Sequence, residues 1–174
     1  MKVFKEEQRF TQTWIIVLLL SSTIVPLVII FNEYFENQNA FTVWELVLII
    51  SIALLAPAII FLFKLYTRID ETGIHYKYFP FHLKFKTILW SDISKAYVRQ
   101  YDALTEYGGW GLKGGVFWKK SKGIAINVSG DIGIQLELKS GKKVLIGTNL
   151  KEDAKNVLFS YKHKIEQEEL KHHG

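Results

Sequence analysis

The chain lacks cysteine altogether over its 174 residues. This excludes disulfides, thiolate metal sites and cysteine nucleophiles, so the chain is indifferent to the redox state of its compartment. The length corresponds to about one average domain and excludes a large multidomain enzyme. Hydrophobic residues make up 49% of the chain and aromatic residues 14%. A disordered chain is poorer in such residues, so the composition indicates a folded protein.

Charge is missing from two long stretches of the first third. No charged residue lies between Phe10 and Asn32, and none lies between Leu46 and Phe63. At about 1.5 Å per residue, each run covers most of a hydrocarbon layer of roughly 30 Å. A cleaved signal peptide has a shorter apolar centre, and a buried soluble helix is rarely apolar all round. The sequence therefore predicts transmembrane helices at 13–31 and 43–65.

The charges that flank these runs predict an orientation. The connection 32–42 carries two acids and neither Lys nor Arg, whereas basic residues precede the first run and follow the second. Because cytoplasmic flanks carry the excess of Lys and Arg, both termini are expected in the cytoplasm. The prediction is a multi-pass protein of the cell membrane, with residues 1–12 as a cytoplasmic N-terminal segment.

The remainder of the chain has a β pattern followed by one helical pattern. Short aromatic and β-branched runs separated by glycine turns predict seven strands, at 67–69, 74–79, 82–90, 94–101, 123–128, 133–138 and 142–146. Asn149 can cap a final helix with one apolar face, formed by Ala154, Val157, Leu158, Tyr161 and Ile165. The expected fold class is α+β, mainly β: a cytoplasmic unit at 66–169 with a bent sheet or open barrel plugged by the helix, and a mobile tail at 170–174.

Several segments carry a family resemblance: 67–74 (TRIDETGI), 88–93 (ILWSDI), 107–111 (YGGWG), 127–130, 133–138 and 141–148. With the preceding pair of apolar helices, they resemble bacterial membrane-anchored proteins with a pleckstrin-homology-like (PH-like) domain, mostly without assigned function. The likeness covers nearly all of residues 65–160. It implies a seven-stranded PH-like fold closed by the C-terminal helix, and it implies no substrate.

A glycine-rich loop is the most distinctive feature of the β region. Gly109, Gly111 and Gly114 formally satisfy the dinucleotide fingerprint G-x-G-x-x-G, and Asp131 follows about twenty residues later. That fingerprint needs a helix to receive the pyrophosphate, whereas a strand-like segment follows here. We expect a glycine-rich β connection with Trp110 folded onto the barrel, and no cofactor.

Basic and aromatic residues gather in and after this loop. From Tyr66 onward 18 basic and 12 acidic residues give about +6, and this charge lies beside an anionic leaflet in the expected topology. The predicted partner-binding or lipid-binding residues are Tyr107, Trp110, Lys113, Phe117, Trp118, Lys119, Lys120 and Lys122. Alternatively, these lysines only keep the unit soluble and satisfy the positive-inside bias. Nucleic-acid binding is not expected, because the charge is modest and no reading helix is recognised.

Catalytic and metal-binding patterns are not recognised. The five histidines lack ligand spacing with a carboxylate, and neither G-x-S-x-G nor H-E-x-x-H occurs. Asp70, Asp102 and Asp131 fall in expected turns, where Asp usually caps or closes the backbone. The sequence predicts a protein that is not an enzyme and has no metal site.

The resulting hypothesis is a membrane-anchored PH-like binding or scaffolding module at the cytoplasmic face of a bacterial membrane, which engages a protein partner or anionic lipid. The first alternative is a small-molecule-binding or enzymatic membrane subunit that uses the loop 106–122. The second is a stress-related structural protein that forms a homo-oligomer through its helices.

Overall fold

The computed structural model describes residues 2–37, 41–114 and 123–172, with side chains described up to residue 166. The chain divides into two compact units. One contains Phe10–Leu62, and the other combines Met1–Arg9 with Phe63–Gly174. We call them the helical unit and the β unit.

The helical unit contains α1 (Thr13–Glu36), α2 (Val43–Ala58) and the short 3-10 helix η1 (Ile59–Leu62). The stretches Thr13–Glu36 and Val43–Leu62 are each long and apolar enough to cross a membrane. Both expose most of their side chains, unlike the core helix of a soluble protein. The first helix runs five residues past the expected end at 31, because nothing between Asn32 and Glu36 breaks a helix.

The second apolar helix ends before the expected boundary at 65. Its start is fixed by a capping box, in which Thr42 and Glu45 exchange hydrogen bonds between side chain and backbone. Its end is set by the sheet. Lys64 already pairs with Arg9 on one side and with Phe79 on the other, which requires extended backbone at that position.

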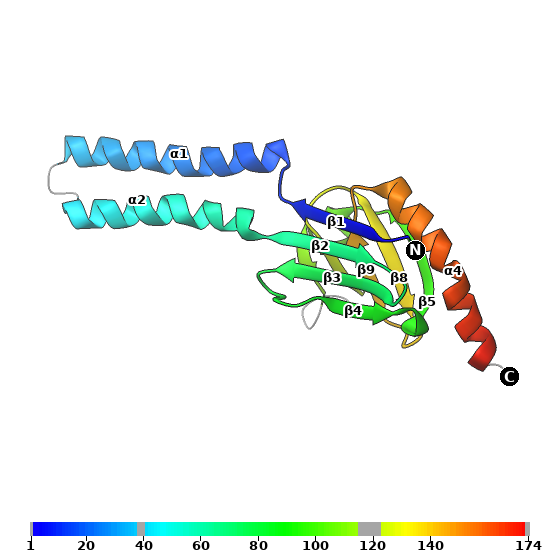
Figure 1. The fold of residues 1–174 in the computed structure, drawn as a ribbon. Coiled ribbons are helices and arrows are strands. Elements are labelled where there is room, and N and C mark those ends of the chain that lie inside the picture. Colours follow the sequence, from blue (N-terminus) through cyan, green and yellow to red (C-terminus); the bar gives the residue numbers. More distant parts are fainter. Residues whose placement is uncertain (1, 38–40, 115–122, 173–174) are drawn as a thin grey trace. The chain divides into compact units, whose positions relative to one another are not determined.

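Nine strands form two sheets in the described part of the β unit (Figure 1). The four-stranded sheet has the order β1 (Phe4–Arg9), β2 (Lys64–Ile69), β3 (Gly73–Phe79), β4 (Lys86–Leu89). The five-stranded sheet has the order β5 (Ile93–Gln100), β8 (Ile132–Leu138), β9 (Lys143–Gly147), β7 (Ile124–Asn127), β6 (Gly111–Lys113). Neighbouring strands are antiparallel, except for the parallel pair β7 and β9.

The expected α+β class is confirmed. In place of the seven strands expected from residue 66 onward, the described residues form eight, β2–β9, and β1 adds a ninth from the N-terminal segment. Strand β1 was expected to be part of a separate N-terminal segment, and it pairs along its whole length with β2. Its inward side chains include Glu6 and Gln8, so the usual alternation of apolar residues is missing. Gln8 Nε2 donates to the Gly147 carbonyl at 2.7 Å, and Glu6 accepts from the Thr148 hydroxyl at 2.6 Å.

Two further elements differ from expectation. The strand expected at 82–90 is reduced to β4, because residues 80–85 form a loop and Trp90–Asp92 form the 3-10 helix η2. The final helix α4 spans Lys151–His172 and so continues into the expected tail at 170–174, of which residues 173–174 lie outside the described part. Asn149, the expected cap of this helix, lies two residues before its first residue Lys151, and its side chain exchanges hydrogen bonds with Ser129.

The core of the β unit lies between the two sheets and α4. The helix buries the predicted apolar face, namely Ala154, Val157, Leu158, Tyr161 and Ile165. Trp90 stacks on Tyr161 with ring centroids 5.3 Å apart, and its Nε1 donates to the Asp70 carbonyl at 2.9 Å. At about 1.5–3 kcal/mol for each fully buried aliphatic or aromatic side chain, this face accounts for the docking of α4.

Candidate functional site

The predicted site residues separate into three groups in the structure. Tyr107 is buried, with 2% of its surface exposed, while Trp110 and Lys113 are half-buried near the surface. The other five, Phe117, Trp118, Lys119, Lys120 and Lys122, lie outside the described residues. Tyr107 therefore supports the surface from below and does not form part of it.

A one-turn helix, α3 (Ala103–Tyr107), positions these residues and was not predicted. Asp102 caps it, since its Oδ1 accepts from the backbone N–H groups of Leu104 at 2.8 Å and Thr105 at 3.0 Å. The hydrogen bond from the Thr105 N–H is the main cause that lowers the pKa of Asp102. Gly108 ends the helix in the left-handed conformation, with φ of 71°. The expectation that Asp102 caps the backbone is confirmed.

A second, smaller core lies beneath α3, on the five-stranded sheet. It consists of Tyr101, Ala103, Tyr107, Ala125 and Leu145, with Trp110 packed against it. The Tyr101 and Tyr107 rings meet edge to face at 6.0 Å. Burial raises the pKa of Tyr101 to about 12, and its hydroxyl accepts from Asn127 Nδ2 at 2.8 Å. The tyrosine is therefore a neutral structural group at physiological pH.

Arg99 ties α3 to the sheet. Its Nη1 and Nη2 donate to the two carboxylate oxygens of Glu106 at 3.1 and 2.8 Å. Its Nη2 also donates to the Tyr107 hydroxyl at 3.2 Å, and its Nε donates to Gln135 Oε1 at 3.0 Å. A bidentate pair of this kind fixes both side chains. No local sequence pattern predicts this cluster, because its members come from β5, α3 and β8.

An open cleft of about 460 Å³ lies beside α3. It is lined by Gln100, Tyr101, Asp102, Ala103, Leu104, Glu106, Trp110, Gly130 and Asp131. Trp110 Nε1 donates to the Gly130 carbonyl at 3.0 Å, which holds the indole at the border of the cleft. Gln100 Nε2 donates to Asp131 Oδ2 on the other side. The expectation that Trp110 folds back onto the β structure is confirmed.

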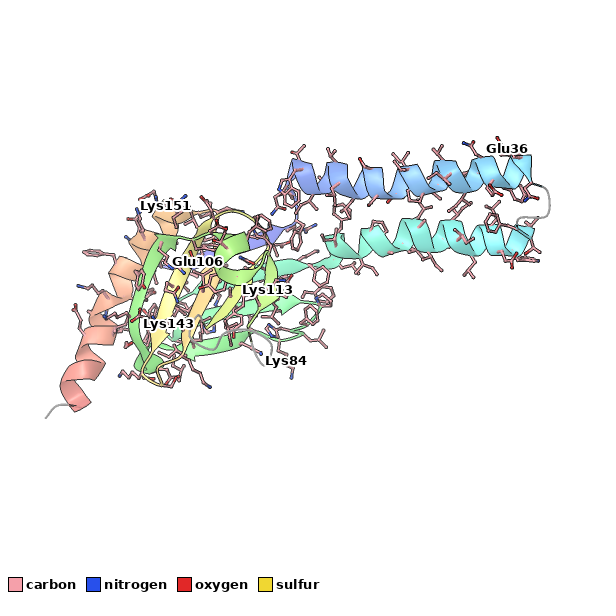
Figure 2. All side chains as sticks on the ribbon, turned by 180° about the vertical axis from the view of Figure 1, so that it is seen from behind. Glu36, Lys84, Glu106, Lys113, Lys143 and Lys151 are labelled. Carbon is pink, nitrogen blue, oxygen red and sulfur yellow. The ribbon has the colours of Figure 1, made fainter. Side chains whose placement is uncertain are left out.

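The chemistry of this cleft differs from the basic surface predicted for the loop. The described residues that line it include three carboxylates and neither Lys nor Arg. Lys113 stands in β6, opposite Ala125 of β7, and Figure 2 labels it together with Glu106 of α3. Glu106 is paired with Arg99, so the net negative charge of the lining comes from Asp102 and Asp131. Such carboxylates beside an indole face suit a cationic or hydrogen-bond-donating group and repel an anionic one.

The glycine fingerprint is part of a β connection. Strand β6 occupies Gly111–Lys113, where the dinucleotide fingerprint requires a helix to begin. Gly109, Gly111 and Gly114 all have positive φ, which residues with a side chain rarely adopt. Among the described residues, no group of three or more His, Asp or Glu side chains could hold a metal ion.

A polar chain on the four-stranded sheet was missed by the sequence reasoning. His75 Nδ1 lies 2.8 Å from the Thr87 hydroxyl, and His75 Nε2 lies 3.0 Å from Asp70 Oδ1. Burial alone raises the pKa of Asp70, but hydrogen bonds from His75, from the Thr72 N–H and from Arg68 outweigh it and hold the pKa well below its usual range. The same Asp70 carboxylate closes the β2–β3 turn by accepting from the Thr72 N–H. These hydrogen-bonded side chains therefore stabilise the sheet.

Comparison of the chain with protein-family models, with curated proteins and with solved structures found no match.

Proposed function

We propose that this protein is a membrane-anchored binding module. In this proposal α1 and α2 span a bacterial membrane, and the β unit is a PH-like domain on the cytoplasmic side that binds a partner protein. The unit acts as a scaffold and not as an enzyme. Attachment to the membrane surface removes most of its translational freedom, so weak contacts with other membrane proteins gain a high effective concentration.

The register of β1 and β2 is the observation that carries this proposal. Arg9 and Lys64 are directly opposite each other at one end of the sheet. The chain enters α1 four residues after Arg9, and η1 ends two residues before Lys64. The β unit is thus connected to apolar helices at two adjacent points, as expected for a module tethered by a helical hairpin.

Charge at the ends of the helices supports the proposed orientation. Glu33 and Glu36 lie in the last turns of α1, next to the connection between the helices, where Figure 2 labels Glu36. At the other ends, Arg9 and Lys64 stand in the adjoining strands. The excess of basic residues at the β unit favours the cytoplasmic side for that unit.

The cleft beside α3 is the candidate surface for the partner. Its carboxylates and the fixed Trp110 favour a basic segment of another protein over an anionic lipid. Leu104 lines the same cleft with 62% of its surface exposed, and so adds an apolar contact. Aromatic and apolar anchors framed by polar groups are typical of protein-binding surfaces.

Site-specific photocrosslinking in intact membranes tests this proposal. A crosslinking residue at position 104 is expected to give a discrete protein adduct, which Asp131→Lys weakens several-fold. The matched control is position 139, an exposed site in the β8–β9 turn, where the adduct is expected to be absent. Equal adducts at both positions, or no adduct at 104 in membranes that retain the protein, would contradict the proposal.

One observation also favours a small-molecule-binding subunit. The cleft volume of about 460 Å³ lies within the range of known ligand sites. Thermal-shift screening of the detergent-solubilised protein with small organic cations tests this second candidate. A ligand that raises the melting temperature, and loses that effect in Trp110→Ala, would favour it over the scaffold.

A further inference from the structure

The loop of residues 80–85, between β3 and β4, exposes large apolar side chains to the surroundings. Phe81 is 65% exposed, Leu83 77% and Phe85 47%. They alternate with polar residues over five positions of a single loop. Scattered single apolar residues need no explanation, but a group of large ones on one loop marks an interaction surface.

Stacked aromatic rings hold this loop in place. The Phe81 ring stacks on those of Phe63 and Tyr78, with centroids 5.8 and 5.9 Å apart. The backbone N–H of His82 donates to the Tyr78 carbonyl at 2.7 Å. Tyr78 itself is 2% exposed. Because these contacts already order the loop, transfer of its exposed side chains into an apolar environment costs little additional conformational entropy.

The loop lies at the end of the sheet where the β unit is connected to the helices. Phe79, the last residue of β3, pairs with Lys64, the first residue of β2, and Lys64 pairs with Arg9. Figure 1 shows the β3–β4 connection at the same end of the sheet as the start of β2. The apolar stretch Val43–Leu62 ends two residues before Lys64. The loop therefore leaves the sheet at the end where β1 and β2 are joined to the two apolar stretches.

The charge around the loop has one sign. Residues 73–90 contain three lysines and neither Asp nor Glu. Lys84 and Lys86 are exposed, and Figure 2 labels Lys84 on this loop. Lys77 Nζ lies 4.4 Å from the Tyr66 ring centre and 5.4 Å from that of Phe85. Exposed rings flanked by lysines are complementary to the boundary between acyl chains and anionic headgroups.

We propose that the loop of residues 80–85 inserts into the interface of an anionic bilayer and docks the β unit on the membrane. Phe81, Leu83 and Phe85 enter the headgroup and acyl boundary, while Lys84 and Lys86 contact acidic headgroups. This inference rests on the proposed membrane insertion of α1 and α2. It is independent of the cleft beside α3.

The absence of native cysteine gives a direct test on the full chain in proteoliposomes. Leu83→Cys carries an environment-sensitive fluorophore, and Thr72→Cys is the matched control. Thr72 is exposed in the turn at the opposite end of β2 and β3, roughly 20 Å away for six residues of strand. In vesicles of phosphatidylcholine and phosphatidylglycerol, the label at 83 is expected to shift to the blue, to be quenched by brominated lipid and to resist aqueous iodide. The label at 72 is expected to behave as in water.

A third label separates the two proposals. Ile24→Cys, near the middle of α1, reports whether the helices are inserted. Quenching by brominated lipid at 24, with positions 83 and 72 equally open to iodide, overturns the docking inference alone. Access of iodide to position 24 overturns membrane insertion, and the docking inference with it.

Charge reversal tests the role of the lysines. Lys84→Glu with Lys86→Glu is expected to lower the docked-to-undocked ratio of the label at 83 by roughly tenfold or more. Lys139→Glu with Lys142→Glu, in the exposed β8–β9 turn, gives the same change of net charge as a control and is expected to have little effect. Equal protection in both double variants overturns the headgroup contact. Protection of position 83 in cells but not in vesicles overturns a lipid occupant in favour of a protein.

Discussion

The two units of this protein use the same aliphatic residues in opposite ways. In the β unit, Ile134 and Ile146 are fully buried, whereas Ile29 and Ile52 of the helical unit are 62% and 58% exposed. Each fully buried side chain of this kind gains about 1.5–3 kcal/mol from its removal from water. The β unit obtains this gain from its own packing. The exposed side chains of the helices can obtain it only from apolar surroundings outside this chain, so exposure and not composition distinguishes the two units.

The largest expected effect comes from charge in the helices. Ile24→Arg with Ile52→Arg places one cation near the middle of each apolar stretch, at about 2.5–3.5 kcal/mol each on insertion scales. The membrane fraction that resists alkaline carbonate extraction is expected to fall sharply. The pair Ile24→Leu with Ile52→Leu controls for the change of shape. If the arginine variant stayed fully in the carbonate-resistant membrane fraction, the helices would not need an apolar environment, and the contrast with the β unit would be wrong.

A smaller effect is expected in the core of the β unit. Ile134→Ala should lower the free energy of unfolding by about 2–5 kcal/mol, because it removes buried methylene groups and leaves a cavity. Leu55→Ala in the exposed face of α2 is the matched substitution and should leave the β unit unchanged. Denaturation of the full chain in detergent, followed by tryptophan fluorescence, measures both. Equal losses in the two variants would contradict the comparison.

The sequence predicted those elements whose pattern is apolar and local. The two apolar helices follow from the length of their uncharged runs, and most strands of the β unit and the buried face of α4 follow from periodicity. Strand β1 did not, because Glu6 and Gln8 point inward toward partners more than 130 residues away. A short charged segment that pairs with a distant strand resembles a tail until the register is known.

The candidate site was predicted less completely than the fold. Trp110 and the glycine connection were identified, since their composition is unusual. Arg99 and Gln135 were missed, because their contacts with α3 depend on the strand order. Leu83 and Phe85, which are exposed in the loop 80–85, were predicted within the strand at 82–90, since alternation of apolar and polar residues is also the pattern of a half-buried strand.

The β unit also holds a buried charge, the carboxylate of Asp70. Asp70 lies under its partners Arg68 and His75 in the β unit, and its lowered pKa means that the folded state favours the ionised carboxylate. The resulting stability is present above the ordinary Asp pKa of about 3.9 and is lost as the pH falls below it. Asp70→Asn should therefore be less stable by about 1.5–3 kcal/mol at pH 7, and the gap should narrow toward pH 3. Denaturant titrations at both pH values check this, and a constant gap would contradict it.

Two buried threonines of the β unit make a finer test of polar groups. Thr148 is 1% exposed, and its hydroxyl donates to Glu6 and accepts from the Leu150 N–H. Thr148→Val keeps the shape and removes both hydrogen bonds, so the free energy of unfolding should fall by about 1–3 kcal/mol. Unfolding in denaturant measures the loss, and Thr148→Ser should recover part of it.

Thr67 gives the smallest expected effect, with the opposite sign. It is 2% exposed on β2, and its Oγ1 has no hydrogen-bond partner among the described residues. Thr67→Val replaces an unsatisfied hydroxyl by a methyl group of similar size, so the free energy of unfolding should stay constant or rise by up to about 1 kcal/mol. Since Thr67 and Thr148 are equally buried threonines, burial alone predicts the same result for both variants. A loss in Thr67→Val as large as that in Thr148→Val would show that hydrogen-bond partners do not decide the cost of a polar group in this core.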